Sequence, residues 1–244
     1  MASIIEAFDS TIKEAFAGLK VLIWAVPVCF AVSAWQSSMG SIVGIVTAVL
    51  FVGYLTTICN NIIIKTDRIL PGINVFQYGL VGLIAVLIMI PYGIVAYFVW
   101  NLVNKISIPD PVWGLTVKVL GVFLALSFIL SAFVLYIRRL NPVDAYNFRK
   151  YFIGFGEVFM SFSYLIVKLA LWSLVIIGFL VYLFSLFVGF ENVLWTYLMC
   201  AFGVFYCILG ANYMAQTSEE IFTFLEKKEN EQKQQKAIDK MTEE

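Results

Sequence analysis

Long stretches without a single charged side chain are the feature that most constrains how this chain folds. They cover residues 21–64, 69–104, 119–137, 169–190 and 192–218. A helix crosses the hydrocarbon layer of a bilayer in about 20 residues, so each stretch is long enough for a span. The first stretch is long enough for two, and a polar turn at residues 36–40 divides it. The sequence therefore predicts six membrane-spanning helices.

Composition points to the same location. Of the 244 residues, 61% are hydrophobic and 13% are charged, whereas soluble domains have about 45–50% apolar and about 25% charged residues. A membrane β-barrel needs segments of about 10 residues with strict alternation, and residues 83–98 are apolar throughout. We therefore expect an all-α integral membrane helical bundle of six transmembrane helices. Its expected parts are an amphipathic helix over 1–20, a membrane domain over 20–217 with spans near 20–36, 41–64, 78–102, 113–137, 164–189 and 192–215, and a polar tail over 218–244.

The distribution of Lys and Arg predicts the orientation, because these residues in short loops remain on the cytoplasmic side. With the N-terminus inside, every Lys and Arg except Lys105 and Lys118 falls on the inner side. We therefore expect a multi-pass protein of the inner cell membrane with both termini in the cytoplasm. Acidic residues before the first apolar run favour a retained first span over a cleaved signal peptide.

The first 20 residues read as an amphipathic helix at the membrane surface. Ser3 and Glu6 form the S-x-x-E pattern of a capping box, which marks a helix start. Charged residues gather on one face of residues 3–20, which is typical of a helix that lies in the membrane interface. The opposite, apolar face is formed by Ile4, Ile5, Phe8, Ile12, Ala15, Phe16 and Leu19.

The segment 142–164 carries two faces of different chemistry. Its aromatic stripe consists of Phe148, Phe152, Phe155, Phe159 and Phe162, and its polar strip of Lys150, Glu157, Ser161 and Lys168. Glu157 and Lys168 lie about 16 Å apart along a helix and cannot pair with each other. Two interpretations stay open: the strip lines a pathway into the membrane, or both groups sit at the interface and Lys168 snorkels toward the surface. Whether 142–163 is interfacial or continuous with the fifth span is also open.

Two loops on the predicted inner side resemble each other. The first carries Arg68, Leu70 and Pro71, and the second carries Arg138, Arg139, Leu140 and Pro142. Each leads to an asparagine suited to cap the next helix, namely Asn74 and Asn141. The echo indicates either a repeated helix–loop–helix unit or a chance similarity. Pro27 and Pro91, near the middle of two spans, are candidate hinges because proline removes a backbone hydrogen bond.

The loop and helix motifs also resemble a known family. Leu70-Pro71, Phe76, Gly79-Leu80 and Ile90-Pro91 are similar to the pattern of a bacterial and archaeal polytopic membrane-protein family, domain of unknown function 4013. Later segments similar to its second half are Ala145–Phe148 and Ala211–Met214. The resemblance implies a prokaryotic multi-pass membrane protein, and it implies no activity, ligand or site.

Several function classes lack the residues they need. The chain contains no histidine, which removes histidine-based catalysis and histidine metal sites. No aspartate falls within a predicted span, so a pair of intramembrane catalytic aspartates is excluded, and a net charge of zero gives no basis for binding nucleic acid. We therefore expect no enzyme and no cofactor.

Two functions remain. The first is an accessory or scaffold protein that contacts membrane lipids and a membrane or cytoplasmic protein partner, the latter through the polar tail. The alternative is a small transporter or channel-like protein that uses proline-broken spans one and three and the polar strip. The sequence defines neither a substrate nor an oligomeric state.

Overall fold

The computed structural model describes residues 4–14, 16–34, 37–66, 68–72, 74–106, 111–187 and 193–242. Within these ranges every regular element is a helix. The helices are α1 (Ile4–Lys13), α2 (Ala17–Ser33), α3 (Ser38–Ile63), α4 (Val75–Lys105), α5 (Pro111–Ile137), α6 (Pro142–Ala145), α7 (Phe148–Phe187) and α8 (Val193–Thr242).

The all-α, multi-pass class predicted from the sequence is confirmed. Five segments are long and apolar enough to cross a membrane: Ser38–Ile63, Val75–Lys105, Val112–Ile137, Lys150–Lys168 and Leu194–Phe224. The bent pair formed by α1 and α2 makes up to six if it counts as one broken span.

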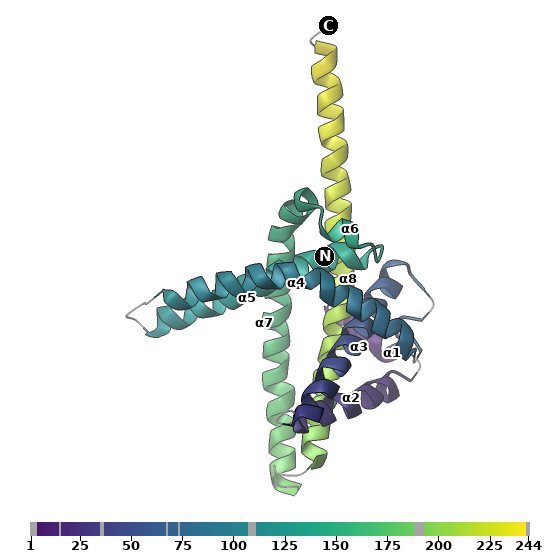
Figure 1. Cartoon of the computed structure of the whole chain (residues 1–244), viewed down its shortest axis with the longest axis vertical. Helices are drawn as coiled ribbons and strands as arrows, with labels where there is room; N and C mark the ends of the chain where they lie inside the picture. Colours follow the sequence, from purple (N-terminus) through teal and green to yellow (C-terminus); the bar gives the residue numbers. More distant parts are fainter. Residues whose placement is uncertain are drawn as a thin grey trace.

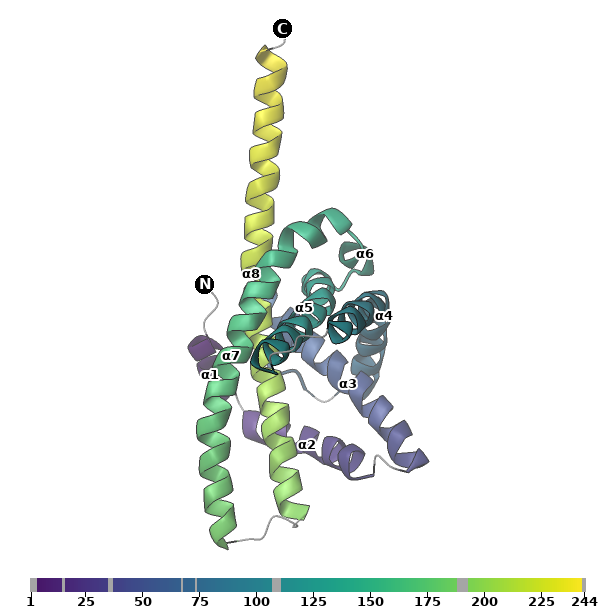
Figure 2. The same cartoon turned by 90° about the vertical axis from the view of Figure 1, so that its left-hand side faces the viewer.

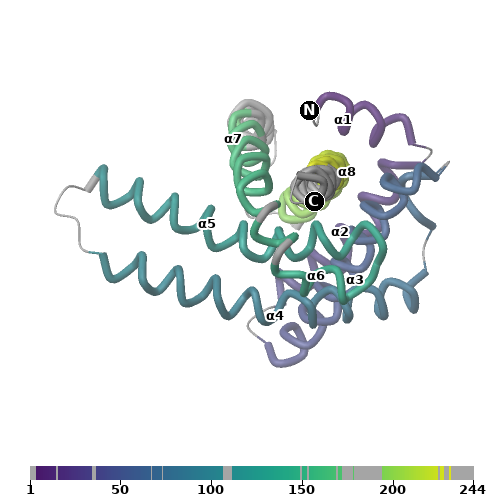
Figure 3. The backbone as a smooth tube through the Cα atoms, turned by 90° about the horizontal axis from the view of Figure 1, so that it is seen from above, coloured from purple at the N-terminus to yellow at the C-terminus, as the bar shows by residue number. Residues whose placement is uncertain are grey.

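The apolar helices cross one another instead of running parallel. α7 and α8 run side by side in opposite directions, and α8 continues far beyond the rest of the chain (Figures 1 and 2). α4 and α5 form a hairpin that projects sideways across this pair (Figures 1 and 3). Apart from Gly121, the buried residues of this hairpin lie in the first two-thirds of α4 and the second half of α5. The tip of the hairpin therefore has its apolar side chains exposed.

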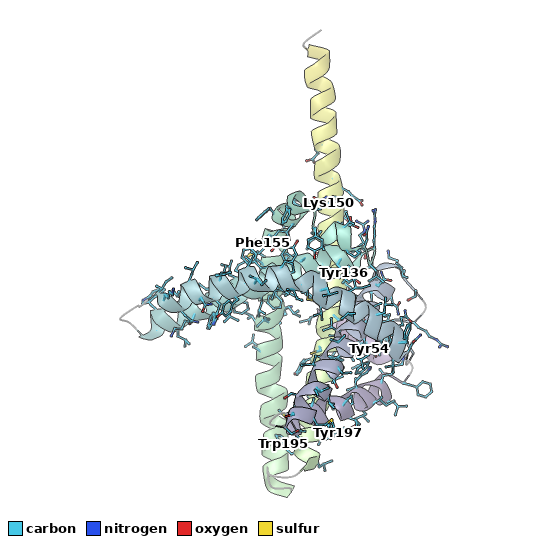
Figure 4. All side chains as sticks on the ribbon, in the orientation of Figure 1. Tyr54, Tyr136, Lys150, Phe155, Trp195 and Tyr197 are labelled. Carbon is cyan, nitrogen blue, oxygen red and sulfur yellow. The ribbon has the colours of Figure 1, made fainter. Side chains whose placement is uncertain are left out.

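Glycine allows α3 and α4 to touch backbone to backbone. A Cβ atom on Gly53 would lie 1.9 Å from the carbonyl oxygen of Tyr78, and one on Gly82 would lie 2.0 Å from that of Val49. Small residues permit this close approach between membrane helices, where packing is the main source of association. The aromatic cluster of Trp24, Tyr54 and Tyr78 joins α2 to this pair, with the Trp24 and Tyr54 rings 4.9 Å apart (Figure 4 labels Tyr54).

The N-terminal helix differs from the expectation. The predicted continuous helix over 3–20 is broken after Lys13, and α1 and α2 meet at 95°. Phe16, at the break, has φ 61°, a left-handed conformation in which a helix cannot continue. Ser3 and Ala15 lie outside the described residues.

The face that α1 packs against the rest of the chain includes only part of its apolar face. Its buried residues are Ile4, Ala7 and Thr11, while Ile5 and Ile12 are 69% and 54% exposed. The small Ala7 side chain lets the backbone of α1 approach α8.

The start of α7 settles how residues 142–164 are arranged. α6 is a single turn capped by Asn141, whose side chain accepts a hydrogen bond from the Val143 N–H. The chain then turns, and α7 runs without a break from Phe148 to Phe187. The aromatic segment is therefore continuous with the helix that contains the predicted fifth span, residues 164–189. Pro27 and Pro91 likewise lie inside continuous helices, so neither proline ends its helix.

Candidate functional site: two arginine loops at the end of one helix

The C-terminal end of α3 holds the first arginine loop, which we define as residues 64–72. The Asn61 side-chain amide donates to the carbonyl oxygens of Arg68 and Ile69, at 3.2 and 3.3 Å. Lys65 has φ 54°, the left-handed turn that commonly follows a helix end. Leu70, which belongs to this loop, has a fully buried side chain. Asp67 lies outside the described residues.

A partly buried ion pair fixes the same loop from the α1–α2 elbow. The Ile69 N–H donates to the Glu14 carboxylate at 3.2 Å, and the Lys20 ammonium donates to the Leu70 carbonyl at 2.5 Å. Lys20 and Glu14 lie 3.8 Å apart, with their side chains 19% and 10% exposed. A buried charge is retained when it is paired and hydrogen-bonded. The elbow and the loop therefore form one unit.

The neighbouring residue of α3 holds the second arginine loop, defined as residues 138–141. The Asn60 amide donates to the carbonyl oxygens of Ile137 and Arg138, at 3.1 and 3.5 Å. Leu140 has φ 49°, so both loops contain one left-handed residue after a helix end. The two motifs that resemble each other in the sequence are therefore brought to one place by adjacent asparagines.

Two tyrosines of α4 anchor the segments that follow these loops. The Tyr78 hydroxyl donates to the carbonyl oxygen of Gly72. The Tyr92 hydroxyl donates to that of Ala145 at 2.5 Å. Asn74 caps α4 as predicted, because its side chain accepts from the Gln77 N–H at 3.2 Å.

Helix α8 contacts both arginine loops where it leaves the apolar part of the chain. Lys65 pairs with Glu219 at 3.3 Å, and Arg138 pairs with Glu226 at 3.0 Å. The Arg138 guanidinium also lies 4.3 Å from the centre of the Phe222 ring. The candidate site is therefore a junction of two cationic loops and one helix.

The polar strip and the aromatic stripe of α7 both flank its packed face. Among the α7 residues whose burial the structure describes, the buried ones are Tyr151, Gly154, Val158 and Leu165, and at 100° per residue they lie between the two predicted faces. Phe155 and Phe162 contact α5, with Phe128 and Phe123 at ring distances of 4.9 and 6.3 Å. The remaining stripe residues are exposed (Phe148, Phe152) or half-buried (Phe159).

The structure places the charges of the polar strip at different depths along α8. A Cβ on Gly154 would lie 3.3 Å from Ile221, so Glu157 lies near the level of Ser218, where the polar tail begins. Lys168 lies about 16 Å further along α7, beside a part of α8 without charges. Its ammonium lies 4.3 Å from the centre of the Tyr164 ring, one turn back toward Glu157. The strip is therefore extended along one face: Glu157 is exposed, and Lys150, Ser161 and Lys168 are half-buried (Figure 4 labels Lys150).

A second polar contact, which involves Asn212, was not predicted from the sequence. Asn212 of α8 is 2% exposed, and its amide donates to the Ala7 carbonyl, the Ser10 hydroxyl and the Thr11 hydroxyl at 2.9–3.1 Å. It joins α1 to α8. An uncharged asparagine inside an apolar run is the signal that points to this contact, because buried amides need partners.

Apolar grooves lie away from the polar strip. One of about 640 Å³ is formed by α2, α3 and α8, and one of about 450 Å³ lies between the elbow and α8. Within the described residues, no group of three or more His, Cys, Asp and Glu side chains is arranged to hold a metal ion.

No family model, no curated protein and no solved structure matches this chain. The candidate site is therefore defined by its geometry alone.

Proposed function

We propose that this protein is an accessory or scaffold component of a membrane, without catalytic activity of its own, that acts through lipid and protein contacts. One observation supports this most directly: α8 runs uninterrupted from its apolar segment into a projecting polar helix, and ion pairs tie it to both arginine loops where it emerges. A partner that binds the projecting part is thereby coupled to the membrane part.

The use of polar side chains supports the same role. Asn60, Asn61, Tyr92 and Asn212 donate to backbone carbonyls of other segments, which fixes helices and loops in place. Such bonds between membrane helices contribute about 0.6 kcal/mol each on average, and several together define one arrangement. These side chains therefore serve to hold the helices and loops in place.

The proposed orientation places the arginine loops and both termini in the cytoplasm, at the inner membrane of a prokaryotic cell. The start of α1 favours a common side for the termini, because Glu6 lines a cavity of about 610 Å³ together with Gln216, Glu219 and Lys227 of α8. The Lys and Arg residues in the loops indicate that this common side is the cytoplasm. The resemblance to domain of unknown function 4013 fits this proposal and adds no activity to it.

The transport alternative has weaker geometric support. A transport pathway needs polar groups around an enclosed route near the middle of the membrane, usually with interrupted helices. The polar strip follows one face of α7, the described grooves are lined by other helices, and the helices that contain Pro27 and Pro91 are continuous. We therefore place the accessory role first.

Native mass spectrometry after gentle extraction into lipid nanodiscs tests this proposal. We expect a second protein at fixed stoichiometry with the full chain, and its loss when residues 227–244 are deleted. The deletion leaves the Arg138–Glu226 pair in place, so it separates partner binding from folding. A lone chain, together with a solute flux in proteoliposomes that Glu157→Gln or Lys168→Met abolishes, would replace the accessory role with transport.

A further inference from the structure

Four cations belong to the two loops that α8 contacts as it leaves the apolar part of the chain. Lys65 and Arg68 belong to the first arginine loop, and Arg138 and Arg139 to the second, and Asn60 and Asn61 hold these loops side by side. Arg68 and Arg139 are exposed, and the side chains of Lys65 and Arg138 are 77% and 30% exposed. The chain thus presents a cationic rim, which we define as these four residues.

Exposed apolar side chains flank the cationic rim. Ile64 and Phe76, at the two sides of the first arginine loop, are 57% and 82% exposed, and Val143, after the second, is 73% exposed. Exposed cations beside exposed apolar groups suit a membrane interface, where apolar groups enter the bilayer and cations remain among the headgroups. The C-terminal ends of α3 and α5, both candidate spans, are joined by the hydrogen bond from Asn60 to the Ile137 carbonyl.

Helix α8 supplies two carboxylates to the same cations. Glu219 and Glu226 are seven residues apart, so they lie on one face of α8, about 10 Å apart along its axis. The Glu219 and Glu226 side chains are 52% and 60% exposed. Exposed ion pairs are weak and are screened by salt, so an anion of higher charge density can take their place.

We propose that the cationic rim binds the phosphate groups of anionic phospholipids in the adjoining leaflet, and that Glu219 and Glu226 compete with those phosphates. Arginine suits this role because its guanidinium binds phosphate oxygens in a bidentate manner. The charge of the lipid then determines how firmly α8 is held against the two loops. The inference rests on the proposed lipid-contacting function and names the lipid class that it uses.

The test compares lipid retention in nanodiscs made from phosphatidylglycerol and phosphatidylcholine in equal amounts. Native mass spectrometry of the full chain should show more retained phosphatidylglycerol. Each basic residue near an anionic surface contributes a factor of about five, so Arg68→Gln with Arg139→Gln should lower the preference by about 25-fold. Glu219→Gln with Glu226→Gln should raise it.

The matched control is Lys105→Gln with Lys118→Gln, which removes two cations near the tip of the α4–α5 hairpin. Its preference should equal that of the unaltered chain, and all variants should melt alike in phosphatidylcholine alone. If the arginine variant is unstable there, a second double variant, Lys65→Gln with Arg68→Gln, takes its place.

Two results would overturn the inference. One is an unchanged preference in the arginine variant. The other is an equal loss in the control. Displacement of the retained lipid by inorganic phosphate at low millimolar concentration would instead identify the rim as a site for free phosphate. A protein partner lost on deletion of residues 227–244 would leave the accessory role in place even if the lipid preference were absent.

Discussion

Replacing Gly82 with alanine should separate α3 from α4, one of the two most extensive helix pairs among the described residues. The added Cβ would lie 2.0 Å from the Val49 carbonyl oxygen and close to the Gly53 backbone. Contacts of a Cβ below 3.0 Å essentially never occur, and the neighbour here is backbone, which has no rotamer to change. The two helices must therefore move apart by about 1 Å.

The cost follows from this displacement. Overpacking of a tight contact lowers the free energy of unfolding by about 1–3 kcal/mol. Alanine is more favourable than glycine in a helix by up to about 1 kcal/mol, which offsets part of this loss. Because the clash is with backbone, we take the upper part of the overpacking range, about 2–3 kcal/mol. The net destabilisation is then about 1–2 kcal/mol, which corresponds to a fall in Tm of roughly 2–8 °C for a chain of this size. Gly53→Ala should behave alike, because its Cβ would lie 1.9 Å from the Tyr78 carbonyl oxygen.

Thermal unfolding in nanodiscs, followed by tryptophan fluorescence, measures this effect. Gly79→Ala is the matched control on the same helix, because its nearest neighbour is the Leu50 Cδ2 at 3.6 Å, an ordinary contact. Its Tm should stay unchanged or rise slightly. Equal Tm values for the Gly79, Gly82 and Gly53 variants would refute the backbone contact between α3 and α4.

Other predictions concern the polar contacts. Asn212→Leu should weaken the contact of α1 with α8 and lower the free energy of unfolding by about 1 kcal/mol. Proteolysis near residue 13 should become faster, and less so in the control Gln216→Leu. Equal cleavage rates in the two variants would contradict the contact. Asn60→Leu should speed amide hydrogen exchange in residues 138–141, and Asn61→Leu should speed it in residues 64–72. The reverse pattern would show that each loop is held by the other asparagine. Lys168→Met should change the free energy of unfolding by less than about 0.5 kcal/mol, because a half-buried lysine is replaced by a similar apolar stem; a large loss of stability would indicate a buried partner.

Local sequence signals predicted the elements well because they act over a few residues. Each charge-free run falls largely within one or two of the helices α2, α3, α4, α5, α7 and α8, and the two asparagine caps lie where the pattern placed them. The break at Phe16 was missed because a left-handed conformation at a non-glycine residue has no propensity signal. The elbow there is instead held by Glu14, whose partner is 55 residues away.

Faces and junctions were less predictable than elements. On α7 the aromatic stripe and the polar strip are both clear in the sequence, yet the face that packs lies between them and contains Gly154 and Val158. Hydropathy ranks side chains by polarity, whereas packing between membrane helices favours shape and close approach. The two arginine loops are adjacent because α3 packs against α5. This is a tertiary contact, and local sequence patterns do not specify it.

The central claim is that both arginine loops and the emerging part of α8 form one junction. Cross-linking in native membranes, with the four cysteines replaced by serine, tests it most directly. A short bis-maleimide should join Lys65→Cys to Glu219→Cys and Arg138→Cys to Glu226→Cys within one chain, while Lys118→Cys with Glu219→Cys should stay unlinked. Absence of both expected links, with each single cysteine reactive, would contradict the account.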